Sequence, residues 1–94
     1  MTTEVKASHI LVKTEEEALN LYNDIVKNSI SFADAASEYS LCPSGHNGGD
    51  LGYFERGMMV KPFEDAAFSM EVGEISHPVK TQFGWHLIQL TDKK

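Results

Sequence analysis

The sequence predicts an α+β domain, in which a four-stranded and mostly antiparallel sheet is surrounded by helices. Segments with the two-residue alternation of β-strands open and close the chain, and segments with helical periodicity lie between them. The order of the predicted elements is β-α-α-β-α-β-β. The 94 residues, of which 41% are apolar, suffice for one domain with a modest core. We therefore expect residues 1–94 to form a single domain.

The first strand is predicted over residues 5–13. Ala7, His9 and Leu11 alternate onto one face of this strand, while Ile10 and Val12 alternate onto the other. Because both faces carry apolar side chains, we expect a central strand with both faces covered.

Two helices are predicted next, over residues 14–28 and 31–40. Thr14 and Glu17 form a capping box at the start of the first helix, which Asn28 can end. Ser31 can cap the second helix in the same way. The predicted buried stripes comprise Ala18, Leu21, Tyr22, Ile25 and Val26 in the first helix, and Phe32, Ala35, Ala36 and Tyr39 in the second.

The middle of the chain, residues 41–63, holds five of the seven glycines together with large apolar side chains. Flexible linkers lack such side chains, so we expect a shaped loop over residues 41–50 and a short strand over 51–54. A turn at residues 55–57 and a third helix, opened by Pro62 and ending at residue 69, follow.

The last part of the chain is predicted to supply two further strands, over residues 74–80 and 85–91, with a turn over 81–84 between them. Pro78 marks the first of these as an edge strand or a bulge. In the second, His86 and Ile88 alternate with Trp85 and Leu87.

Composition limits the classes of function. The net charge of −6 disfavours a nucleic-acid surface, which needs a basic patch. No apolar run approaches the roughly 20 residues that span a bilayer. The first residues lack the pattern of a secretory signal, and we expect a cytoplasmic location without membrane contact. The single cysteine excludes an internal disulfide.

Three side chains are candidates for chemistry. His9 and His86 lie in predicted central strands, where a lone histidine is usually a hydrogen-bonded core residue. Cys42 in the glycine-rich loop is either inert or a nucleophile that a histidine activates. A zinc site built from these three and Asp50 lacks the compact ligand pairs of structural sites, and we expect neither metal nor cofactor.

Apolar side chains around the glycine-rich stretch have two interpretations. As a set they suit either the core or a partly exposed pocket for an apolar ligand. The residues concerned are Leu51, Met58, Met59, Phe63 and Phe83.

Four segments together resemble the parvulin-type peptidyl-prolyl cis/trans isomerases. They are S-H-I-L-V-K at residues 8–13, G-G-D-L-G-Y-F at 48–54, G-M-M-V-K-P-F-E-D-A-A-F at 57–68 and Q-F-G-W-H-L-I at 82–88. They occur in the family's order and cover nearly the whole chain. The family fold is a four-stranded antiparallel sheet surrounded by helices, which agrees with the element order above.

The resemblance also implies a set of site residues. The family's paired histidines match His9 and His86, and its cysteine or aspartate at the active-site loop matches Cys42. Thr81 matches a threonine that joins the histidine hydrogen-bond network. A proline-binding pocket is implied for Leu51, Met59 and Phe63, with Phe83 lining the site.

The resemblance implies catalysis of X–Pro bond rotation in unfolded or flexible protein segments, with proline-containing peptides and unfolded clients as partners of a monomer. Phosphate-directed members carry basic residues after the first strand, where this chain has Glu15, Glu16 and Glu17. We therefore expect no phosphoserine requirement. The alternatives are a module that binds proline-containing peptides without turnover and, with no supporting signature, a Cys–His hydrolase.

Overall fold

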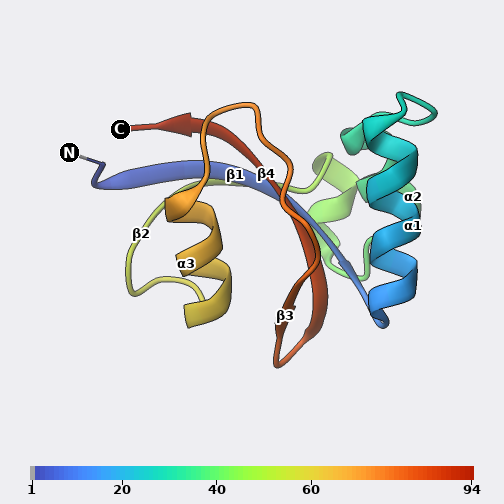
Figure 1. Cartoon of the computed structure of the whole chain (residues 1–94). Helices are drawn as coiled ribbons and strands as arrows, with labels where there is room; N and C mark the ends of the chain where they lie inside the picture. Colours follow the sequence, from blue (N-terminus) through green and yellow to red (C-terminus); the bar gives the residue numbers. More distant parts are fainter. Residues whose placement is uncertain (1) are drawn as a thin grey trace.

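A computed structural model describes residues 2–94 and shows a curved antiparallel sheet with helices on both faces (Figure 1). The strand order is β2-β1-β4-β3, so β1 and β4 are central. Residues of the strands are Glu4–Val12 in β1, Asp50–Glu55 in β2, Val79–Thr81 in β3 and Gly84–Lys93 in β4. The predicted four-stranded α+β fold with its β-α-α-β-α-β-β order is confirmed.

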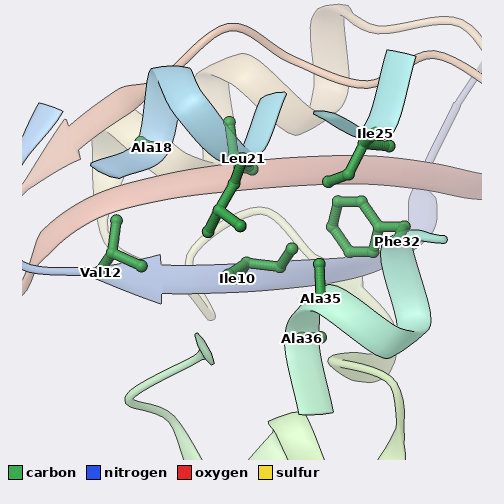
Figure 2. Packing of buried hydrophobic residues seen from close by; sticks show 9 residues of the cluster. Ile10, Val12, Ala18, Leu21, Ile25, Phe32, Ala35 and Ala36 are labelled. Atoms are coloured by element: carbon green, nitrogen blue, oxygen red, sulfur yellow. The ribbon is translucent and has the colours of Figure 1, made fainter. Parts of the chain in front are cut away.

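The two faces of the sheet carry separate apolar clusters. Helices α1 (Glu15–Val26) and α2 (Phe32–Tyr39) cover one face, and α3 (Lys61–Ser69) covers the other. Figure 2 shows the first cluster, where Ile10 and Val12 of β1 meet Leu21 and Ile25 of α1. The second cluster includes Ala7 and Ile88 of the central strands together with residues of α3. The alternation predicted for β1 therefore holds.

Helix starts follow the predicted capping. The Thr14 hydroxyl oxygen accepts a hydrogen bond from the Glu17 backbone N–H and donates to the Glu17 carboxylate. The Ser31 hydroxyl oxygen accepts a hydrogen bond from the Asp34 N–H. Asn28, expected to end α1, adopts a positive φ of 62° just after it.

Several predicted details are wrong. The strand expected over residues 74–80 is reduced to β3 and an isolated bridge between Ile75 and Gln89, because Pro78 has no N–H to continue the ladder. Val26 and Tyr39 are about half exposed. Both are the last residues of their helices, where few neighbours cover a side chain.

The loop expected over residues 41–50 contains a short 3₁₀ helix, η1 (Pro43–Asn47). The turn before β4 is also shorter than predicted, because its two ends belong to β3 and β4. Within residues 2–94, no helix is long and apolar enough to cross a membrane.

Candidate active site

The two predicted histidines meet on the face of the sheet that α3 covers. His9 pairs with Ile88 across β1 and β4, while His86 pairs with Leu11, so the two histidines are diagonal neighbours on one face. Their Nδ1 atoms lie 3.0 Å apart, and both side chains are buried. The prediction that the sheet brings His9 and His86 together is therefore correct.

Thr81 at the end of β3 extends this contact into a chain of hydrogen bonds. Its Oγ1 lies 2.7 Å from His86 Nε2 and accepts a bond from the Phe83 N–H at 3.1 Å. Thr81 therefore contacts His86 as the resemblance implied, but it lies behind the histidine and does not line the cavity described below.

The Thr81 hydroxyl, His86 and His9 form one chain of hydrogen bonds that can run in either direction. If the Thr81 hydroxyl donates to His86 Nε2, then His86 Nδ1–H donates to His9 Nδ1, and the proton of His9 resides on Nε2. In the reverse direction His9 Nδ1–H donates to His86 Nδ1, and His86 Nε2–H donates to the Thr81 oxygen. Of the buried side-chain nitrogen and oxygen atoms in residues 2–94, His9 Nε2 alone lacks a partner.

Burial keeps both imidazoles neutral. Desolvation lowers the pKa of His86 from its ordinary value of 6.5 to about 4, and the neighbouring His9 adds to this shift. Desolvation also lowers the pKa of His9. At neutral pH the pair therefore supplies dipoles and hydrogen bonds without a net positive charge.

An apolar cavity of about 500 Å³ opens above the histidine pair. Phe63 of α3 meets both imidazoles edge-on, with ring centroids 5.6 Å from His9 and 5.2 Å from His86. We call the apolar lining the cup. Its residues are Leu11, Leu41, Pro43, Leu51, Met58, Met59, Val60, Phe63 and Phe83.

The predicted pocket residues are brought together at this site. Leu51, Met59, Phe63 and Phe83 all line the cavity, together with Cys42 and both histidines. Phe83 at 60% and Met58 at 63% exposure stand at the open side of the cup. Large apolar groups exposed around a cavity are available to a ligand, so the pocket interpretation is favoured for Met58 and Phe83. Phe63 is buried and belongs to the second core cluster, against which Leu51 and Met59 pack, so these three side chains serve both the core and the pocket.

Cys42 lies half-buried at the cup, just before η1. Its Sγ accepts a hydrogen bond of 3.3 Å from the Ser44 hydroxyl, and its backbone N–H donates to Ser40 Oγ. Among the described residues, no hydrogen bond joins Cys42 to His9 or His86. A Cys–His hydrolase needs a base beside its thiol, so this arrangement disfavours that alternative.

Gly49 lets the loop backbone lie directly against the site. Its carbonyl accepts a hydrogen bond of 2.9 Å from the His9 N–H, and its φ is 82°. A Cβ at this position would overlap the His9 carbonyl oxygen. The glycine-rich segment therefore serves close approach to β1 rather than flexibility.

Sequence reasoning missed several neighbours of the site. Leu11 shares the face of His9, and Leu41 and Pro43 flank Cys42, so position alone could have suggested all three. The two serines that bond Cys42 carried no signal in the sequence. Within residues 2–94, no three His, Cys, Asp or Glu side chains gather closely enough to hold a metal ion.

A four-stranded antiparallel sheet with a buried histidine pair below an apolar cup is the arrangement expected for a parvulin-type isomerase. The chain belongs to the PPIC-type peptidyl-prolyl isomerase family, whose sequence pattern matches residues 1–94. The predicted resemblance to the parvulins is thereby confirmed.

Relatives of two kinds support this assignment. The chain is 50% identical over 91 residues to the foldase protein PrsA of Geobacillus sp. strain WCH70, covering 96% of this chain and 33% of the relative. It thus spans about a third of that protein. It is 43% identical to the peptidyl-prolyl cis-trans isomerase pin1 of Rhizopus delemar, covering 93% of this chain and 72% of the relative.

Solved structures agree with the fold. PrsA of Bacillus anthracis superposes with a TM-score of 0.94 at 44% identity, covering 99% of this chain and 43% of that one. NmPin, the parvulin of Nitrosopumilus maritimus, superposes with a TM-score of 0.86 at 45% identity, covering 98% of this chain and 99% of that one. The second match shows that a chain of this extent alone has the parvulin fold.

Proposed function

We propose that the chain catalyses cis/trans isomerisation of X–Pro bonds in unfolded or flexible polypeptides, and that it needs no phosphate before the proline. The observation that carries this proposal is the lining of the cavity. It consists of apolar side chains, one thiol and two histidines whose lowered pKa values keep them neutral. No lysine or arginine is found among the described residues that line the cavity. A phosphate would find no charged partner there.

The chemistry needs no covalent step. The trans form of an X–Pro bond is favoured by only about 0.5–1 kcal/mol, but a barrier of roughly 18–20 kcal/mol separates it from cis because twisting removes amide resonance. An enzyme accelerates the rotation by binding the twisted amide more tightly than either planar form. The cup can hold the proline ring while the preceding residue turns.

Individual residues then have distinct roles in the proposal. Met59 and Phe63 contact the proline ring from the cup, and an apolar surrounding favours the less polar twisted amide. The histidine pair fixes the floor of the site in one hydrogen-bonded arrangement. Cys42 contributes a polar group at the edge of the cup without attacking the carbonyl carbon.

Exchange NMR on matched peptides tests the proposal. The peptides differ only before proline, with alanine, leucine, serine, phosphoserine or glutamate at that position. We expect acceleration of cis/trans exchange on the uncharged peptides, and no gain on phosphoserine over serine. Uncatalysed exchange takes tens of seconds or longer, so acceleration is easily measured.

Two outcomes would overturn parts of the proposal. A preference of about tenfold or more for phosphoserine over serine would contradict phosphate independence. Binding of the peptides by the folded chain without acceleration would instead establish a peptide-binding module. The Met59→Ala variant serves as the internal control. It removes an apolar side chain of the cup, on the face of the sheet opposite to the cluster that α1 and α2 cover.

Two further properties belong to this proposal. The chain is proposed to act as a monomer on proline-containing clients, without nucleic acid or membrane as partner, and sedimentation at increasing concentration checks the monomer. Its net charge of −6 supports the exclusion of nucleic acid as a partner. A cytoplasmic location stays a prediction from the sequence, and fractionation of the source cells checks it.

A further inference from the structure

Glu64, on the first turn of α3, is a buried carboxylate that none of the roles above uses. The residue is 5% exposed. Its Oε1 accepts a hydrogen bond of 2.5 Å from the Gly57 N–H, and its Oε2 lies 3.0 Å from Arg56 Nη1. A buried charge is retained in a fold only where it is paired and hydrogen-bonded, as it is here. We call Glu64, Arg56 and Gly57 the clasp.

The partners of Glu64 belong to the turn between β2 and α3. Gly57 has a φ of 92°, a conformation that favours glycine, so this turn has one specific shape. The Arg56 guanidinium lies 4.5 Å from the centre of the Phe68 ring on α3 while it bonds Glu64. The carboxylate thus fastens both residues of the turn to the helix.

The segment closed by the clasp carries much of the cup. Between Gly57 and Glu64 lie Met58, Met59, Val60 and Phe63, and each of them lines the cavity. Methionine side chains are flexible, so a wall made of them keeps its shape only if the backbone beneath is fixed. Arg56 Nη1 also lies 3.7 Å from the Asp65 carboxylate of α3, but both of those side chains are exposed. Val60 at the N-cap position provides no side-chain bond, so Glu64 is the buried polar link between the turn and the helix.

We propose that Glu64 is a positioning residue for substrate binding, which acts through Gly57 and Arg56 to hold Met58 and Met59 in place for the proline ring. This inference rests on the proposed function. Glu64 itself does not line the cavity. A purely structural role would lower stability alone, whereas a positioning role lowers affinity for the substrate in molecules that remain folded.

Three substitutions separate the hydrogen bond to Gly57 from the charge pairing of the carboxylate. Glu64→Gln keeps an oxygen acceptor for the Gly57 N–H but loses the charge that pairs with Arg56. Arg56→Ala removes the 3.0 Å ion pair and leaves the exposed Lys61 Nζ, 3.9 Å away, as the remaining charged neighbour, whereas Glu64→Ala removes every contact. We expect KM to rise about threefold in Glu64→Gln and about tenfold in Glu64→Ala, with kcat within about twofold of the wild type.

Control variants match the loss of stability at a distance from the cup. Leu21→Ala and Ile25→Val remove buried methyl groups from the cluster on the opposite face of the sheet. They are chosen so that their denaturant midpoints should lie on either side of those of the Glu64 variants, and we expect their KM values to equal that of the wild type. If Glu64→Ala does not fold, Glu64→Gln and Arg56→Ala complete the comparison.

Methyl NMR reports on the surroundings of individual methionines independently of the overall stability of the chain. The signals of Met58 and Met59 should shift in the Glu64 variants, while that of Met70, buried at the other end of α3, should stay. Unchanged Met58 and Met59 signals, or a KM equal to that of the stability-matched controls, would overturn the inference and leave the isomerase intact. An inactive wild type would instead overturn the proposed function.

Discussion

Cys42 has a thiol bonded to the Ser44 hydroxyl and no bond to either histidine in the described part of the chain. A thiol attacks a carbonyl carbon poorly without a base beside it. A hydrogen-bonding role fits these contacts better, and an aspartate could also fill such a role.

We therefore expect Cys42→Asp to keep at least about a tenth of the wild-type kcat/KM, because the polar group at the cup is retained. Exchange NMR on an alanine–proline peptide measures it, with Cys42→Ala as the comparison that lacks a polar group. A loss of about a thousandfold or more in folded Cys42→Asp would show instead that the sulfur is a nucleophile.

The histidine pair predicts a pH dependence of stability. The pKa of His86 is lowered by burial to about 4 in the folded chain, whereas the unfolded chain has the ordinary 6.5. Between these values the unfolded state binds the extra proton, so the free energy of unfolding falls as the pH decreases from 6.5 towards 4. Above pH 6.5 His86 is neutral in both states, so its contribution to the free energy of unfolding is fully present there.

Urea unfolding between pH 7 and 5 measures this effect, in a window above the titration of most carboxylates. Nitrogen-15 NMR of the imidazoles checks its origin, because His86 should stay neutral at pH 5.5. The exposed His46 provides the reference signal in the same spectrum. Protonation of His86 near its ordinary pKa would contradict the prediction.

Residue types and alternation in the sequence predict only part of the site. Once β1 and β4 are neighbours in one antiparallel sheet, alternation puts His9 and His86 on one face. Their Nδ1–Nδ1 contact depends on the register between the strands, which pairs His9 with Ile88. Local sequence does not encode this register, and the resemblance to the parvulins supplied the missing information.

Among the elements, the helices were the best predicted because their signals are local. The capping box of α1 and the serine cap of α2 appear in the structure where the sequence placed them. The segment before β3 was predicted poorly, because its pairing with β4 is interrupted at Pro78 and leaves only one isolated bridge. The 3₁₀ helix η1 was missed because it contains Pro43 and Gly45, residue types that are typical of irregular loops.

The cap of α1 gives a prediction for this element. Thr14→Ala removes the acceptor for the Glu17 N–H and should lower the free energy of unfolding by about 0.5–2 kcal/mol. Since α1 lies on the face opposite the cup, kcat/KM should stay unchanged. Thr14→Ser, which keeps the hydroxyl, is the matched control in urea unfolding. A fall in the kcat/KM of Thr14→Ala would contradict the expectation that the cap of α1 affects stability alone.

In the whole molecule, one face of the sheet carries a core cluster alone, whereas the other carries a core cluster and the cup. Helices α1 and α2 build an apolar cluster on one face, while α3 and the central strands build both the second cluster and the cup on the other. The central position of β1 and β4 followed from their apolar faces in the sequence. The size of the cavity did not, because it results from how α3 and the loop before β2 lie together.

The net charge of −6 acts on clients before they reach the cup. A negative field attracts cationic chains and repels anionic ones over about one Debye length, roughly 10 Å at 0.1 M salt. Alanine–proline peptides flanked by lysines should therefore have a kcat/KM about two- to fivefold higher than those flanked by glutamates at low salt.

Exchange NMR at about 20 mM and 500 mM salt tests this expectation, because screening removes long-range attraction but not short contacts. We expect the two peptides to converge at high salt, with a serine-flanked peptide unaffected throughout. A difference that persists at 500 mM would locate the preference in direct contacts at the cup. Equal rates at low salt would show that the acidic residues lie too far from the approach path to influence clients.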